Sequence, residues 1–323
     1  AASASSRSPA SATSLDAMLT LLLAARRHFA ELLPSPAVAK ALGRAAAVDA
    51  EVGELAQLRR PFRLRPAGQW PSAALMERRL KPESDVQPFQ WLRADPVWLQ
   101  PDLTTARLMA WGNLGLTAED AAALMAPLKP LFGDFGYVFE SREAEAWSVQ
   151  CPRETRLPSF RHPLAALGDD AFPYLPEGPD APRWRSLMGE AQVLMHQHPV
   201  NAERARRGLP PANSLWFWGE GGLPDQVEGP IGHVATADPE LAAYATAAGA
   251  SVSDRVDATK PGLIDLRAER RWPVIDDLLA LALAAMGQGA FATVRLDFAD
   301  GHLVTIEPAQ RWRFWKPAFK GFA

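Results

Sequence analysis

The residues best suited to chemistry crowd into one short stretch in the second half of the chain. Arg204, Arg206 and Arg207 could each meet a phosphate or carboxylate group with paired hydrogen bonds. Trp216 and Trp218 follow in an apolar run, and two residues apart in a strand they share one face, where they could wall a pocket. These residue types could together recognise a small anion, with Arg204 as its clamp.

Polar and glycine residues of the same stretch would shape its loop. Asn201 and Asn213 flank a Pro-Pro turn and could fix it, and His198 opens the stretch. Gly219 and Gly221 could let the backbone approach a ligand closely. The alternative is purely structural: a tight turn clamped by stacked tryptophans, with the arginines in water.

This stretch also carries a family resemblance. Its pattern, H-P-x-N-x-x-R-x-x-x-G-x-P-P-x-N-S-L-W-x-W-G-x-G-x-x-P, runs from His198 to Pro224. It resembles a motif of the archaeal-type cofactor-independent phosphoglycerate mutases, which belong to the alkaline phosphatase superfamily. The chain is also similar to bacterial proteins described as phosphoglycerate mutases or as predicted regulatory proteins.

The resemblance is specific in this stretch, diffuse over residues 90–250 and weak elsewhere. Weaker echoes are Trp91-Leu-Arg-Ala-Asp-Pro-Val and the loop of residues 168–178. The first echo adds Arg93 and Asp95 to the candidate ligand-binding residues.

The metal site that the resemblance implies is harder to find. Those mutases use two divalent metals, held by Asp and His residues, and a Ser nucleophile. The first 90 residues hold no Asp-Gly dipeptide of the kind that the family's metal motif contains. His196-x-His198 would diverge on a helix, and Asp297-x-x-Asp300-Gly301-His302 is typical of a hairpin turn. We therefore expect no metal and no other cofactor; Mn²⁺ or Mg²⁺ would enter only if the chain is an active mutase.

Other enzyme classes lack their signatures. The sequence contains no Gly-x-Ser-x-Gly, no Walker A and no Gly-x-Gly-x-x-Gly. The single cysteine, Cys151, excludes a disulfide framework and a cysteine-based zinc site.

Charge and composition bound the partners. The 34 basic and 37 acidic residues give a net charge of −3, which argues against a general binder of nucleic acid or of an acidic membrane. We expect a cytoplasmic protein with a small anionic or phosphorylated ligand, or a protein partner. Cations alternate with aromatics over residues 311–316, a pattern that can bind single strands of nucleic acid. The preferred interpretation is a third antiparallel strand with its aromatic face on the core.

The pattern of elements predicts an α/β fold: a layered mixed sheet flanked by helices, with an antiparallel C-terminal hairpin. Residues 1–17 are expected to be disordered or a leader, and residues 18–323 to form one α/β domain, with two subdomains and a loop-rich insertion around 90–225 as the alternative. Predicted strands include 19–24, 89–99 (broken at Asp95-Pro96), 231–236, 262–266, 293–298 and 303–307. Predicted helices include an interrupted one over 37–58 and others over 183–195, 239–248 and 273–286, with one more opening at Thr117.

Together these observations predict a divergent phosphoglycerate-mutase-like protein that lacks the two-metal catalytic site and binds a small phosphorylated ligand or a partner. Two alternatives stay open. One is an active mutase or phosphohydrolase with a rearranged site that uses His198, His302 and Asp297. The other is a protein–protein interaction module.

Overall fold

The computed structural model describes residues 18–29, 34–82, 86–102, 104–230 and 232–321. The expectation for residues 1–17 therefore lies outside the described residues. The chain divides into two units: unit 1 holds the residues up to Arg63 and from Glu228 onward, and unit 2 holds Leu64–Val227. None of the described helices is both long enough and apolar enough to cross a membrane.

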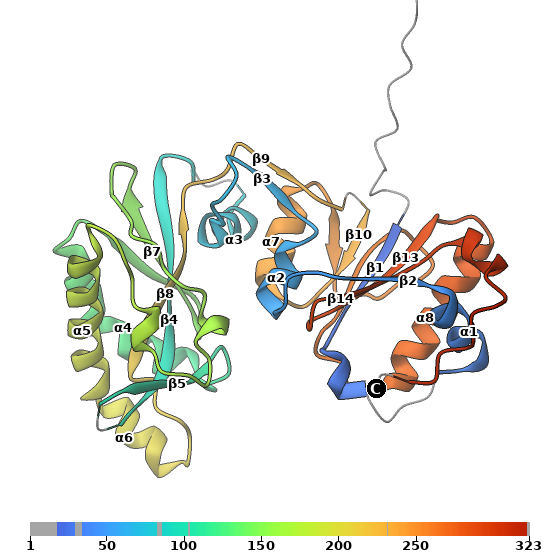
Figure 1. Ribbon diagram of the computed structural model, residues 1–323. Helices are drawn as coiled ribbons and strands as arrows, with labels where there is room; N and C mark the ends of the chain where they lie inside the picture. The colour runs from blue at the N-terminus through green and yellow to red at the C-terminus, as the bar shows by residue number, and fades with distance from the viewer. Residues whose placement is uncertain (1–17, 30–33, 83–85, 103, 231, 322–323) are drawn as a thin grey trace, which may run out of the picture. The chain divides into compact units, whose positions relative to one another are not determined.

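Unit 1 is built on a seven-stranded mixed sheet (Figure 1). Its strands, in spatial order, are β11 (Ser251–Ser253), β10 (His233–Ala235), β12 (Gly262–Leu266), β1 (Met18–Leu23), β13 (Thr293–Phe298), β14 (His302–Ile306) and β2 (Ala46–Asp49). The first five are parallel, and β14 and β2 are antiparallel additions. The predicted fold class and the C-terminal hairpin of β13 and β14 are thus confirmed.

Strand β1 lies at the middle of this sheet because its sequence is apolar on both faces. Residues Leu19–Leu23 are all buried, and β1 pairs in parallel with β12 on one side and β13 on the other. A near-continuous apolar run is typical of a parallel strand covered on both faces. The predicted strand at 19–24 is confirmed.

Helices cover both faces of the sheet of unit 1. Figure 1 shows α2 (Glu54–Arg59) and α7 (Pro239–Ala247) on one side, and α1 (Pro36–Arg44) and α8 (Trp272–Gly287) on the other. The core of α1, α8, β1 and β13 includes Val38, Ile275 and Phe298, all fully buried. The helical segment predicted over 37–58 is interrupted after Gly43, as expected, but the interruption contains the strand β2, which was not predicted.

Unit 2 holds a five-stranded antiparallel sheet. It contains β4 (Phe89–Pro101), β5 (Ala106–Trp111), β6 (Val138–Glu143), β7 (Ala146–Pro152) and β8 (Ser214–Gly221), and β4 pairs with β5, β7 and β8. Its helices are α3 (Ser72–Leu80), α4 (Ala118–Gly133), α5 (Ala181–His196) and α6 (Pro199–Arg206). Two short strands, β3 (Arg63–Arg65) and β9 (Gln226–Glu228), pair with each other where the chain passes between units.

Strand β4 continues through Asp95-Pro96, so the predicted break there is wrong. On one edge of β4, pairing with β7 ends at Arg93 and pairing with β5 begins at Val97. Pro96 has no N–H to donate, and it lies in this gap between two partners. The other edge of β4 pairs with β8 from Trp91 to Val97, and Pro96 lies opposite Leu215.

The predicted third antiparallel strand at residues 311–315 is also wrong. Because β2 already pairs with β14, that edge has no place for another strand. The chain instead forms the short 3-10 helix η5 (Pro308–Trp312), where the side chains of Glu307 and Gln310 cap its start reciprocally. The aromatic side chains of this segment consequently face solvent.

A glycine holds the close approach between the central parallel strands. Gly262 begins β12 opposite His233 of β10 and Leu19 of β1, with a φ of 145°. A Cβ atom there would lie 1.9 Å from the His233 carbonyl oxygen. We expect Gly262→Ala to lower the free energy of unfolding of unit 1 by about 3 kcal/mol or more, measured by urea denaturation.

Gly287→Ala is the matched control for this substitution. Gly287 ends α8, is exposed and has nothing within 4 Å of its would-be Cβ. This change should be neutral or stabilising by up to about 1 kcal/mol. Equal stability of the two variants would contradict the role of Gly262 in the strand approach.

Candidate functional site

The motif helix α6 is fixed at both ends by its own polar residues. His198 is its N-cap, and the Nδ1 atom accepts a hydrogen bond from the Val200 amide at 3.3 Å. The buried side chain of Asn201 donates to the carbonyls of Met195 (2.8 Å) and Ala212 (3.0 Å) and accepts from the Ala212 amide (2.9 Å). Asn201 therefore ties the start of α6 to the end of the loop that follows it.

Arg204 is completely buried, and all three of its guanidinium nitrogens bond to groups of the protein. Its Nε donates to the Pro210 carbonyl at 3.0 Å, and Nη1 donates to the Gly115 carbonyl (3.2 Å) and to Asp120 Oδ2 (3.1 Å). Its Nη2 donates to the Leu114 carbonyl. All three nitrogens thus hold the loop after α6 against the start of α4.

Asn213 and Trp216 are likewise bonded within unit 2. Asn213 accepts from the Leu99 amide and donates to the Leu99 carbonyl, both at 2.8 Å, so it extends the β4–β8 pairing with a side chain. Trp216 is 2% exposed and its Nε1 donates to the Arg161 carbonyl at 2.8 Å.

The two motif glycines bring β8 against α3. Gly219 and Gly221 have φ values of 68° and 136°. A Cβ on Gly219 would lie 3.1 Å from the Cβ of Ser72, and one on Gly221 would lie 3.0 Å from the Cβ of Pro71. The close approach that they allow is to the chain itself.

Arg93 and Asp95 belong to a second buried cluster, which joins two distant parts of the sequence. The Asp95 carboxylate is 2% exposed and pairs with Arg93. It also accepts from Trp218 Nε1 (2.8 Å), Trp111 Nε1 (3.0 Å) and the Trp147 amide (3.1 Å). The central strand β4 and the end of β8 are therefore joined through one carboxylate.

All ten candidate ligand-binding residues lie in unit 2, on or next to β4, β8 and α6. The contacts seen there hold the fold: buried charges and amides bond to one another and to the backbone, and Arg93 Nε alone in this set is buried without a hydrogen-bond partner. A ligand role for these residues stays a prediction. Arg206 and Arg207, at the end of α6, are exposed, and Arg206 carries only an exposed ion pair with Glu203 at 2.6 Å.

Unit 1 has a polar cluster of its own, at the carboxyl ends of the parallel strands. From β10 the chain passes through α7 to β11, and from β12 it passes through α8 to β13, in the opposite direction across the sheet. The boundary between β10 and β12 is therefore a topological switch point, where open α/β sheets bind their ligands.

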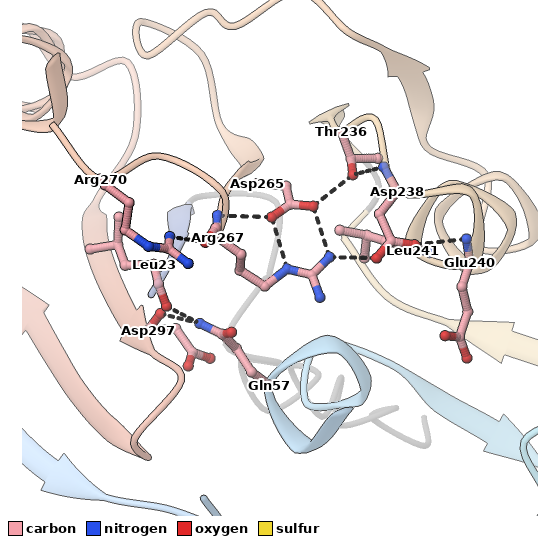
Figure 2. Close-up of polar contacts among 10 residues, drawn as sticks. All are labelled: Leu23, Gln57, Thr236, Asp238, Glu240, Leu241, Asp265, Arg267, Arg270 and Asp297. Carbon is pink, nitrogen blue, oxygen red and sulfur yellow. Dashed lines mark hydrogen bonds and ion pairs between the residues drawn. The ribbon is translucent and has the colours of Figure 1, made fainter. Parts of the chain in front are cut away.

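Arg267 occupies this position (Figure 2). Its Nε and Nη2 donate to the two oxygens of Asp265, both at 2.8 Å, and Nη2 also reaches Asp238 Oδ2 at 2.8 Å. Thr236 Oγ1 donates to Asp265 Oδ2 at 2.8 Å. The other oxygen of Asp238 caps α7 by accepting from two backbone amides. We call Thr236, Asp238, Asp265 and Arg267 the switch-point cluster.

Electrostatics favours the charged form of both Asp265 and Arg267. Burial alone would raise the pKa of Asp265, but hydrogen bonds and the charge of Arg267 outweigh it, and the pKa is lowered. Burial would lower the pKa of Arg267, but Asp265 and then Asp238 raise it. The cluster is therefore a guanidinium held between two carboxylates.

At the carboxyl ends of the neighbouring strands β1 and β13, polar groups are likewise bonded to side chains of the protein. Gln57 of α2 is fully buried and donates from Nε2 to the carbonyls of Leu23 (2.9 Å) and Asp297. The Asp297 carboxylate is 2% exposed and pairs with Arg60. Burial raises the pKa of Asp297, against the opposing effect of Arg60.

The donor set does not fit a two-metal centre in the described residues. No group of three or more His, Cys, Asp or Glu side chains among them could hold a metal ion. Of the residues named for a rearranged site, Asp297 is paired with Arg60, and His302 Nδ1 lies 3.0 Å from Asp49 Oδ1.

Sequence reasoning missed the switch-point cluster, although a signal was present. Thr236, Asp265 and Arg267 stand at or just after the ends of two predicted parallel strands, and Asp238-Pro239 is typical of a helix start. The rule that ligand-binding residues gather at carboxyl strand ends would have pointed to them.

Comparison with known proteins places the chain near one group of enzymes. No model of a protein family matches it. It is 36% identical over 108 residues to a 2,3-bisphosphoglycerate-independent phosphoglycerate mutase of Methanothrix thermoacetophila, a match that covers 32% of this chain and 27% of that one. It is 39% identical over 62 residues to the enzyme of the same name from Methanosarcina mazei, a match that covers 19% and 16% of the two chains. The matched stretch thus spans about a quarter or less of these relatives.

Two solved structures are also similar. A cofactor-independent phosphoglycerate mutase from Thermoplasma acidophilum aligns over 91% of this chain and 90% of its own, with 15% identity and a TM-score of 0.39. A protein from Pyrococcus horikoshii aligns over 90% and 87%, with 11% identity and a TM-score of 0.43. The relatives in sequence confirm, over the matched stretch, the resemblance to cofactor-independent phosphoglycerate mutases.

The role of Arg204 can be tested by its removal. Arg204→Ala leaves Asp120 and three backbone carbonyls without their donor, so we expect it to cost about 3–5 kcal/mol of the free energy of unfolding. The exposed Arg206, on the same helix, is the matched control, and Arg206→Ala should change stability by less than about 0.5 kcal/mol. Urea denaturation measures both, and an Arg204→Ala variant as stable as the control would refute the structural role.

The pairing of Asp265 with Arg267 predicts a pH dependence. Because the folded pKa of Asp265 lies below its unfolded value, its contribution to stability is complete above the unfolded pKa and is lost as the pH falls through the folded one. We expect Asp265→Asn to be less stable than the wild type by about 2 kcal/mol at pH 7. The gap should narrow below about pH 4.

Asp254→Asn, which changes an exposed carboxylate of the same unit, is the control and should show little difference at any pH. Thermal and urea unfolding between pH 3 and 7 would measure the curves. A stability gap between Asp265→Asn and the wild type that widens on acidification would contradict the expected sign.

Proposed function

We propose that the chain is a divergent phosphoglycerate-mutase-like protein that binds a small phosphorylated or anionic ligand in a regulatory role and does not carry out two-metal phosphoryl transfer. The similarity to curated phosphoglycerate mutases supports the relationship. The regulatory role is the part that this proposal adds.

One observation carries the part of the proposal that concerns metals: the guanidinium of Arg267 lies between Asp265 and Asp238 at the switch point. Two-metal phosphoryl transfer needs carboxylates that are free to ligate ions about 3.5–4 Å apart. A guanidinium stays protonated at any physiological pH, so it cannot release these oxygens by losing a proton. Metal binding there would have to displace Arg267 from both carboxylates and compete with the cap of α7.

In this proposal the anion is not bound by Arg204, the clamp predicted from the sequence. Other residues of the motif bind it. Arg204 and Asn201 hold the loop after α6 in place, and the exposed Arg206 and Arg207 present the charge. The ion pair of Arg206 with Glu203 is exposed on both sides, and such pairs contribute little, so an anion can replace it.

An assay of metal-dependent mutase activity tests the first half of the proposal, that the chain does not carry out two-metal phosphoryl transfer. With 3-phosphoglycerate as substrate, we expect no mutase activity in Mn²⁺ or Mg²⁺, and no change on adding EDTA. Conversion to 2-phosphoglycerate would be followed by an enolase-coupled assay. Activity that needs Mn²⁺ and disappears with EDTA would show the chain to be the active mutase instead.

Anion binding tests the second half. Isothermal titration calorimetry with 3-phosphoglycerate should detect binding, and the double variant Arg206→Ala, Arg207→Ala should weaken it at least about tenfold, since hydrogen bonds to charged groups contribute about 1.5–3 kcal/mol each. Arg153→Ala, at an exposed arginine elsewhere in unit 2, is the control. If the wild type gives no binding heat with 3-phosphoglycerate, the ligand-binding half of the proposal is wrong.

A further inference from the structure

Three large aromatic side chains near the end of the described chain lie in water. Trp312, Phe314 and Trp315 are 65%, 77% and 70% exposed. Phe314 and Trp315 are neighbours, with ring centroids 5.5 Å apart. Soluble domains seldom expose contiguous large aromatics, and such a patch marks a contact surface. We call these three residues the aromatic patch.

The backbone beneath the aromatic patch is held in place. Arg44, at the end of α1, donates to the Arg311 carbonyl at 2.7 Å, and Arg313 donates back to the Arg44 carbonyl at 3.1 Å. Lys316 donates to the Ala45 carbonyl at 3.4 Å. Because the anchoring uses main chain and cationic tips, the rings are left facing outward on a fixed support.

The surroundings of the aromatic patch are positive. Residues 308–321 contain four Lys and Arg residues and no Asp or Glu. The cations at the patch, Arg311, Arg313 and Lys316, have no carboxylate partner in the part of the chain that the structure describes; Arg313 and Lys316 bond carbonyl oxygens. Charge complementarity with these three cations therefore favours an acidic occupant.

An open strand edge begins directly beside this segment. Strand β2 follows Ala45, and all four of its residues are exposed, with Val48 at 59%. It pairs with β14 on one side, and no strand of the described residues pairs with its other edge. Free main-chain donors and acceptors on an edge strand are a template for another strand.

We propose that the free edge of β2 and the aromatic patch together bind an extended acidic segment of a partner protein. The segment adds a strand to β2, a recognised mode of peptide binding. Its carboxylates face Arg311, Arg313 and Lys316, and its apolar side chains lie on Trp312, Phe314 and Trp315. This inference does not depend on the proposed anion ligand, which concerns unit 2.

The strand edge favours this occupant over three others. A second copy paired edge to edge would bring two clusters of unpaired cations together around the symmetry axis, where like charges repel. An anionic membrane or a single strand of nucleic acid could meet the rings and cations, but neither can continue the hydrogen bonding of β2.

A fluorescein-labelled octapeptide in which glutamate alternates with valine or threonine tests the proposal with the full chain. We expect fluorescence anisotropy to show saturable binding that weakens as salt rises from about 50 to about 500 mM. The triple variant Trp312→Ala, Phe314→Ala, Trp315→Ala should weaken binding about tenfold or more. The same peptide N-methylated at alternate amides should bind as poorly, because it cannot pair with β2.

Controls make the result specific. Phe172→Ala, at a side chain 52% exposed in unit 2, should leave peptide binding unchanged. A peptide with lysine in place of glutamate should not bind. The proposal is overturned if the acidic peptide does not bind or if the triple variant binds it equally well. Tighter patch-dependent binding of phosphatidylserine vesicles or of a dT12 oligonucleotide would also overturn it.

Self-association is tested separately by sedimentation. A dimer that the triple substitution abolishes would assign the surface to a second copy and overturn the proposal. Calorimetry with 3-phosphoglycerate keeps the two proposals apart, since loss of anion binding in unit 2 leaves the peptide result unaffected.

Discussion

A charge removed from water must be compensated by donors or by an opposite charge, at a cost of several kcal/mol when it is not. This constraint organises both units of the protein. In unit 2, the Asp95 carboxylate gathers Arg93 and three nitrogen donors from separate parts of the sheet. In unit 1, Arg267 gathers Asp265 and Asp238. Strands that are distant in sequence are placed by the charged groups that they must share.

The same constraint separates the roles of motif and site. The motif that links this chain to phosphoglycerate mutases is made largely of residues that satisfy one another: Asn201, Arg204 and Asn213 bond to backbone groups. A motif of this kind holds a loop in place through hydrogen bonds within the protein. The carboxyl edge of the parallel sheet is where an α/β protein binds its ligand, and in this chain its own guanidinium occupies that edge.

Much of the architecture could be predicted from local patterns. The apolar run at Leu19–Leu23 and the Ala-Asp-Gly turn before His302 specify a buried strand and a hairpin, and both are present. Thr117 with Asp120 forms the capping box that opens α4. These features depend on neighbours in sequence, which is why the sequence reveals them.

The features that depend on distant partners were missed. Pro96 does not break β4 because the partner strand changes at that residue, and nothing local shows this. The pairing of Arg267 with Asp238 joins residues that only the parallel order of β10 and β12 brings together.

The division of the chain has a consequence for synthesis. Unit 2 is one continuous segment, whereas the central strand of unit 1, β1, lies between β12 and β13, which come much later in the sequence. On the ribosome, β1 must wait without its partners while unit 2 emerges and can fold. Its buried leucines are then an exposed apolar stretch that chaperones would recognise, so the order of translation shelters a strand that is made early only at a late stage.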